Sequence, residues 1–144
     1  MKLKLLSVGK VKEKNLQKIC DEFAKKILYD AKLELVTIKD SNKDIESEKL
    51  MNYLIRNPGF HIALSEEGEN LSSNGLALLL QSQNKPITFI IGGPNGLSPI
   101  VKSKTNLTLS LSSMTFTHEM AKVFLLEQIY RAISIIKNRK YHKV

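Results

Sequence analysis

Segments typical of β-strands and segments typical of amphipathic helices alternate five times along the chain, with only short links between them. The strand-like segments are apolar or alternating, and they span residues 3–9, 32–39, 60–65, 87–91 and 107–112. Such alternation is typical of α/β domains in which helices flank a parallel sheet. The fourth segment, ITFII, carries no charge, as expected for a buried central strand. We therefore expect an α/β fold with a mostly parallel sheet.

The helical segments are marked by apolar residues that recur at every third or fourth position. In the first of them, Cys20 lies on the apolar stripe and is expected to be a core residue. Candidate N-caps precede three of the helices, namely Ser41 or Asn42, Ser72 or Ser73, and Thr117. The longest helical segment covers residues 118–137.

The chain of 144 residues is long enough for one domain with a substantial core, and neither a repeat nor a linker divides it. A single cysteine allows no internal disulfide, which fits a reducing compartment. The N-terminus lacks the apolar stretch of a signal peptide, and no run reaches membrane-spanning length. We expect one domain over residues 1–144, in the cytoplasm and with no membrane partner.

Positive charge is concentrated in the second half of the chain. Residues 1–69 carry 13 Lys/Arg and 12 Asp/Glu, whereas residues 70–144 carry 9 Lys/Arg and 2 Asp/Glu. No carboxylate occurs between Glu69 and Glu119. A net charge of +8 also suits an ordinary solvated surface, but the acid-free segment favours a polyanionic partner such as a nucleic acid.

Three loops follow apolar strands, at residues 65–68, 92–96 and 112–117. Parallel strands end at a common edge, and ligands of open α/β sheets bind beyond the carboxyl ends of the strands. We therefore expect one site built from all three loops.

The glycine-rich loop GGPNG does not match the common phosphate-binding patterns. A P-loop closes with Lys-Ser/Thr, but Leu97 and Ser98 follow Gly96 here. The dinucleotide fingerprint requires another glycine spacing and a later acid, and metal-assisted phosphate chemistry requires nearby carboxylates. All of these are missing, so the loop is either a tight strand-to-helix turn or a site for an uncharged part of a ligand.

The third loop favours the ligand. The segment SLSSMTFTHEM places small hydroxyl residues between apolar ones directly before a helix. Backbone amides and carbonyls there can bind an adenine edge, and an uncharged pocket suits a cationic ligand such as a sulfonium. The structural alternative is N-capping of the last helix, above all by Thr117.

Several blocks of the chain together resemble one family, the ribosomal RNA large subunit methyltransferase H family of the SPOUT methyltransferases. These blocks are MKLKLLSVGK, LSEEGENLSS, IIGGPNGLSP, LSLSSMTFTHEMAKVFLLEQIYRA and the terminal YHK. The resemblance covers essentially the whole chain. It implies an α/β fold with a C-terminal trefoil knot, a homodimer, S-adenosylmethionine as methyl donor, and methylation of N-3 of a pseudouridine in a 23S rRNA hairpin on the ribosome.

By position, the resemblance implies a donor site made of Leu64, Gly93, Ser112, Ser113, Met114, Thr115, Phe116 and Thr117. Three positions depart from the usual family pattern. Ser65 stands where aspartate is common, Glu69 where lysine is common, and Thr117 where proline is frequent. The missing proline is expected to leave the loop less rigid and the donor more weakly bound.

The reaction implied by the resemblance needs no metal, because the methyl group on a sulfonium is already activated. N-3 of pseudouridine is weakly acidic, so a base or a nearby cation should help it to lose its proton. The candidates are His118, Glu127, Arg131, Tyr141 and His142. We favour His142 and Arg131 as catalytic residues, although Glu127 and Arg131 also have the spacing of an ordinary helical ion pair.

The tail is expected to contact RNA through Arg139, Lys140, Tyr141 and Lys143. The last helix carries more apolar residues than one stripe requires, which favours a two-fold dimer through that helix. These residues are Phe124, Leu125, Leu126, Ile129, Ile133, Ile135 and Ile136. The alternative function is a non-catalytic RNA-binding or ribosome-associated factor. A nucleotide hydrolase is disfavoured by the missing lysine and carboxylates.

Overall fold

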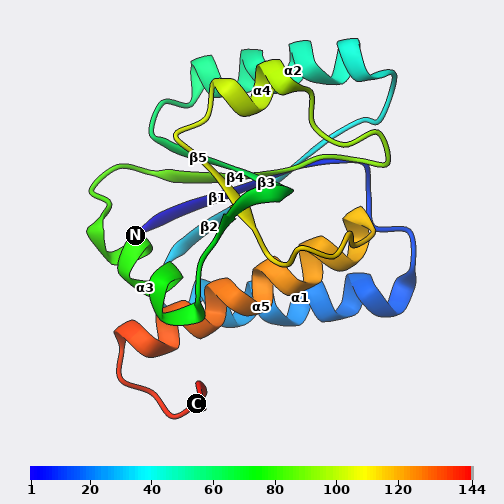
Figure 1. Cartoon of the computed structure of the whole chain (residues 1–144). Helices are drawn as coiled ribbons and strands as arrows, with labels where there is room; N and C mark the ends of the chain where they lie inside the picture. The colour runs from blue at the N-terminus through cyan, green and yellow to red at the C-terminus, as the bar shows by residue number, and fades with distance from the viewer. Residues whose placement is uncertain (144) are drawn as a thin grey trace.

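Five strands form one parallel sheet in the order β2-β1-β4-β3-β5, in a computed structural model that describes residues 1–143 (Figure 1). The strands are β1 (Lys2–Val8), β2 (Lys32–Ile38), β3 (Phe60–Asn70), β4 (Ile87–Ile91) and β5 (Leu107–Ser110). Every neighbouring pair runs parallel. The α/β fold expected from the alternating segments is confirmed, and the trefoil knot stays a prediction.

Helices cover both faces of the sheet (Figure 1). One face carries α1 (Lys14–Leu28), α3 (Ser73–Ser82) and α5 (His118–Ile136), and the other carries α2 (Lys43–Arg56) and α4 (Pro99–Ser103). Because side chains alternate along a strand, each central strand contributes to both layers. Thus Phe89 packs with the first group of helices, whereas its neighbour Ile90 packs with the second.

Three of the expected N-caps are present. Asn42 accepts a hydrogen bond from the amide of Ile45 at 2.9 Å, and Ser72 accepts one from Gly75 at 2.9 Å. Thr117 accepts one from Met120 at 3.2 Å, so it caps α5 as predicted. No helix in the described part of the chain is long and apolar enough to cross a membrane.

The strand β3 is longer than predicted and contains an irregularity. Leu64 and Glu69 both pair with Leu109 of β5, so the four residues between them bulge out of the sheet. A Cβ atom at Gly68 would lie 2.6 Å from the carbonyl oxygen of Thr108, which explains the glycine at this close approach. The predicted loop at 65–68 is therefore a bulge within a strand, and it projects at the carboxyl edge of the sheet.

The apolar residues of α5 are mostly used within the chain itself. Leu125, Leu126, Ile129 and Ile133 are at most 2% exposed, because α5 packs against α1 and α3 beneath the sheet. Among the residues named for a dimer, Phe124 is the exposed one. The number of apolar residues on α5 therefore does not by itself indicate a partner subunit, contrary to the expectation from the sequence.

Candidate functional site

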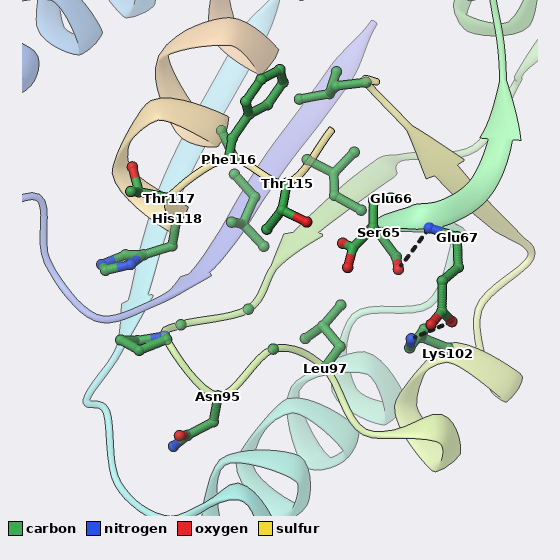
Figure 2. A pocket seen from close by; sticks show the side chains of 18 of the residues that line it. Ser65, Glu66, Glu67, Asn95, Leu97, Lys102, Thr115, Phe116, Thr117 and His118 are labelled. Atoms are coloured by element: carbon green, nitrogen blue, oxygen red, sulfur yellow. Dashed lines mark hydrogen bonds and ion pairs between the residues drawn. The ribbon is translucent and has the colours of Figure 1, made fainter. Parts of the chain in front are cut away.

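The three loops expected to form a site do meet at the carboxyl edge of the sheet, around a pocket of about 530 Å³ (Figure 2). The bulge of β3 forms one wall, and residues 92–96 after β4, which we call the glycine turn, form another. The segment from Leu111 to His118 forms the third wall, and Ala121 of α5 adds to it. Lys43 of α2 and Lys102 of α4 complete the lining. A pocket of this size and place suits a nucleoside-sized ligand.

The glycine turn needs its glycines because backbone approaches backbone. A Cβ atom at Gly92 would lie 2.8 Å from the carbonyl carbon of Gly96, and one at Gly93 would lie 3.1 Å from Cγ1 of Val8. Gly96 has a φ of +69°, and its amide donates to the carbonyl of Gly93 at 2.9 Å. A side chain at Gly93 would thus press on β1. The turn offers a ligand mainly backbone groups.

The loop before α5 is held by short-range hydrogen bonds from serine hydroxyls. Ser110 donates its hydroxyl to the carbonyl of Ser112 at 2.8 Å, and the hydroxyl of Ser112 accepts from the amide of Met114 at 3.0 Å. Together with the Thr117 cap, these bonds order the loop without a charged side chain. The loop has the uncharged, backbone-rich character expected for contact with an adenine edge.

Seven of the eight predicted donor-site residues line this pocket, and Ser113 does not. The seven are Leu64, Gly93, Ser112, Met114, Thr115, Phe116 and Thr117. His118, which the sequence favoured as structural, also lines it. A Cβ atom at Gly9 would lie 3.9 Å from Nε2 of this histidine, so the end of β1 also approaches the site.

The expectation of an uncharged pocket is wrong. Glu66 points into the cavity from the β3 bulge (Figure 2). Its neighbour Glu67 forms an ion pair with Lys102 at 3.3 Å, and Lys43 also lines the pocket. The signal was present in the sequence as the run SEEGE directly after a predicted strand. A carboxylate at the wall of the pocket suits a ligand with a positively charged part.

The predicted catalytic residues, Arg131 and His142, lie together with two other candidates, Glu127 and Tyr141, but outside this pocket. Arg131 donates its Nε to Oε1 of Glu127 at 2.9 Å, and the Tyr141 hydroxyl donates to the same oxygen at 3.2 Å. Nη1 of Arg131 lies 3.1 Å from Nδ1 of His142. The hydrogen bond with Glu127 raises the pKa of Arg131, and burial raises the pKa of the Tyr141 hydroxyl. We call Glu127, Arg131, Tyr141 and His142 the tail cluster.

The tail segment after α5 folds back against the helix. The guanidinium of Arg139 forms two hydrogen bonds with the carboxylate of Asp30, each of 2.7 Å. The ring of Tyr141 packs edge-on against Tyr130, with 4.7 Å between the centroids. Of the four residues expected to contact RNA, Arg139 is thus already paired, whereas Lys140 and Lys143 are exposed.

None of the tail cluster lines the pocket of its own chain. His118 stands at the start of α5 beside the pocket, and Arg131 stands well along the same helix. At 1.5 Å per residue, these two positions are separated by about 20 Å along the helix axis. The predicted donor site and the predicted catalytic pair are therefore two separate clusters within one chain.

A parallel sheet with a nucleoside-sized pocket at its carboxyl edge is typical of α/β proteins that bind a ligand, and this protein belongs to that class. Within this class, the family model described as "Predicted SPOUT methyltransferase" matches residues 1–142. The chain belongs to the SPOUT methyltransferase family, and the resemblance found in the sequence is confirmed.

A relative from Acholeplasma laidlawii (strain PG-8A), named ribosomal RNA large subunit methyltransferase H, is 42% identical over 151 residues. The match covers 99% of this chain and 100% of the relative. TrmJ from Z. mobilis ZM4 has a TM-score of 0.60 at 8% identity, covering 100% of this chain and 72% of its own. The SpoU methyltransferase AviRb from Streptomyces viridochromogenes, solved in complex with AdoMet, has a TM-score of 0.52 at 12% identity, covering 90% and 57%. These two structures show the fold alone.

Proposed function

We propose that this protein transfers the methyl group of S-adenosylmethionine to the ribosomal RNA of the large subunit. The observation that carries the proposal is the pocket formed by three loops at the carboxyl edge of a SPOUT methyltransferase fold. Two comparisons support it, since a full-length relative is named as an rRNA large subunit methyltransferase and AviRb was solved with AdoMet.

In this proposal, the donor lies in the pocket with its adenine against the loop before α5. Backbone groups around Met114 and Thr115 bind the base edge, and Leu64 packs against the ring system. The donor supplies a methyl group already activated on a sulfonium. The carboxylate of Glu66 faces the same cavity and complements the positive charge of the donor (Figure 2).

The acceptor that we propose is N-3 of a pseudouridine. The N–H of this atom loses its proton to solvent, the new N–CH₃ bond forms, and the S–CH₃ bond breaks. The pocket aligns the reacting atoms, and hydrogen-bond donors stabilise the charge on the two flanking carbonyl oxygens. Arg131 and His142 are the donors that we assign to this role.

The distance between the tail cluster and the pocket favours a homodimer. A pair about 20 Å along α5 from its own pocket acts on a donor only if another subunit presents that donor. Met114 lines the pocket and is 75% exposed, and Phe124, which is 37% exposed, packs against Phe116 of the pocket wall. We propose a two-fold dimer in which this surface is covered and each tail cluster serves the pocket of the other subunit.

The exposed Lys140 and Lys143 lie next to the tail cluster and are proposed to bind phosphates. One small basic surface offers little sequence readout, so the proposed substrate is the large subunit within an assembled ribosome.

Transfer of labelled methyl groups from S-adenosylmethionine to purified large subunits tests the proposal, followed by mapping of the labelled nucleotide. We expect label in one pseudouridine of the large-subunit rRNA, and little label in the same rRNA without ribosomal proteins. Binding to ribosomes without transfer, at saturating donor, would instead support a non-catalytic ribosome-associated factor.

A further inference from the structure

The glycine turn that lines the pocket is held by Ser41, which precedes α2, and by Ser47 within α2. Asn95 belongs to this turn, but its side chain points away from the cavity and toward α2 (Figure 2). Its Nδ2 donates a hydrogen bond to the carbonyl oxygen of Ser41, at 3.2 Å. Ser41 directly precedes Asn42, the N-cap of α2. A side chain of the pocket wall thus anchors the wall to the segment that leads into α2.

Ser41 is itself held by a buried carboxylate. Its amide donates to Oε2 of Glu46 at 2.7 Å, and Glu46 is only 2% exposed. The other oxygen of this carboxylate, Oε1, is buried and has no hydrogen-bond partner within residues 1–143. Burying a carboxylate with a free oxygen costs stability, so its presence here suggests a task other than folding.

A second hydrogen bond joins the same two elements. The hydroxyl of Ser47 donates to the carbonyl of Lys43 at 2.7 Å, so the hydrogen bond of 2.9 Å between Oγ of Ser47 and Oγ of Ser98 has Ser98 as its donor. Ser98 follows the glycine turn and caps α4, accepting from the amide of Val101 at 3.3 Å. The turn is therefore attached to α2 on both sides of Gly96.

The glycine turn depends on contacts with other elements, because its glycines have no side chains that could fix its conformation. A Cβ atom at Gly96 would meet nothing within 4 Å, and the residue has a φ that other residues rarely adopt. On the side of β1, Gly93 packs against Val8. The orientation of the backbone groups that face the pocket is therefore set by β1 on one side and by α2 on the other.

We propose that Glu46 and Asn95 are positioning residues for the methyl donor. Glu46 orders the segment before α2 through Ser41, and Ser41 holds Asn95, so that the glycine turn keeps the orientation in which its backbone binds the donor. This inference rests on the proposed function, since it assumes that the pocket binds S-adenosylmethionine.

Asn95→Asp tests the inference at an exposed position where the fold tolerates change. Aspartate has the shape of asparagine but lacks the N–H groups, so it cannot donate to Ser41. We expect its dissociation constant for S-adenosylmethionine to rise about three- to tenfold, the size of one hydrogen bond. The turnover number at saturating donor should stay unchanged, because no group that contacts the reacting atoms is altered. Asn52→Asp, at an exposed site on α2, is the matched control and should bind like the wild type.

Glu46 is tested by a pair of variants. Glu46→Ala removes the acceptor for Ser41 and should weaken donor binding by a similar factor, whereas Glu46→Gln keeps an acceptor and should restore it. Calorimetric titration measures the affinity, and thermal unfolding without donor shows that each variant is folded. Hydrogen exchange adds an independent readout, since the Gly96 amide should exchange faster in Asn95→Asp than in Asn52→Asp.

The possible outcomes separate the two proposals. If the wild type binds the donor and Asn95→Asp binds it equally well, the positioning role is wrong and the proposed function stands. If the folded wild type binds no donor, both are wrong. Weaker binding by Asn95→Asp and Glu46→Ala, with recovery in Glu46→Gln, is the result that the inference requires.

Discussion

Arg131 forms a hydrogen bond with His142, with 3.1 Å between Nη1 of the guanidinium and Nδ1 of the imidazole. A guanidinium donates hydrogen bonds and cannot accept them, so Nδ1 must be the acceptor and carries no proton. In the neutral ring the proton is then on Nε2. While the tail is in this position, His142 offers a hydrogen-bond donor to a substrate, and its lone pair on Nδ1 is already used. This differs from the role of a base, for which the residue type alone would qualify it.

Replacing His142 separates these two roles. We expect His142→Ala to lower turnover about ten- to a hundredfold with little change in donor affinity, because one donor to the developing charge is lost. His142→Gln places an amide N–H where Nε2–H lies and should retain more activity than alanine. Single-turnover rates with large subunits measure this. Equal loss in both variants would favour the base, and wild-type rates in both would make the tail cluster purely structural.

Mixing two impaired variants tests whether the tail cluster serves the other subunit. Ala121→Leu fills the pocket wall, and His142→Ala removes the tail donor. In a mixed dimer, one of the two sites combines an intact pocket with an intact tail, so random exchange should recover about a quarter of wild-type activity. Each variant alone serves as the control. If subunit exchange is demonstrated by mass and no activity returns, each tail acts on the pocket of its own subunit.

The contact between Asp30 and Arg139 predicts a pH-dependent contribution to stability. The hydrogen bonds from Arg139 lower the pKa of Asp30 below its ordinary value of 3.8. The carboxylate therefore stabilises the folded state at pH values above that range, and the contribution is lost as the pH falls through the lowered pKa. We expect Asp30→Asn to lower Tm by up to about 3 °C near neutral pH, because the Arg139 side chain is 44% exposed and solvent weakens the pair.

Thermal unfolding of the wild type and of Asp30→Asn across acidic pH checks this. The difference in Tm between them should shrink as the pH falls below the ordinary carboxyl range. A difference that stays constant down to acidic pH would mean that Asp30 acts through packing. Asp21→Asn, at an exposed position of α1, is the matched control and should show no such change.

The carboxylate of Glu66 should distinguish the donor from its product. S-adenosylmethionine carries a sulfonium charge that S-adenosylhomocysteine lacks, so Glu66→Gln should weaken the first about two- to fivefold and leave the second unchanged. Glu69→Gln is the control, since Glu69 lies in the same acidic run but outside the pocket lining. Equal effects on both ligands would show that Glu66 contacts another part of the donor.

The fold could be predicted because strands and helices differ in the period of their apolar residues. The edge site could be predicted because parallel strands end together, and the glycine turn and the loop before α5 lie as expected. Glu66 was missed because the sequence does not reveal the β3 bulge, which turns this exposed carboxylate into the cavity. The role proposed for Glu46 could not be predicted either, because the hydrogen bond from Asn95 to Ser41 depends on how the segment before α2 meets the glycine turn.

The location of the tail cluster could not be predicted for a similar reason. Periodicity places Glu127 and Arg131 on one face of α5, and this pairing is confirmed. Which end of the sheet that face approaches depends on the packing of α5 between α1 and α3. The number of apolar residues on α5 was wrongly taken to indicate a dimer interface. Most of these residues are instead buried against other elements of the same chain.

Calorimetric titration with S-adenosylmethionine tests the central claim most directly, namely that the pocket between the three loops is a methyl-donor site. The account predicts saturable binding to the wild type and binding at least about tenfold weaker to Ala121→Leu, whose added atoms occupy the pocket. Asn15→Leu, at an exposed position of α1, should bind like the wild type. A folded wild-type protein that takes up no donor at millimolar concentration, or a pocket-filling variant that binds as tightly as the wild type, would contradict the account.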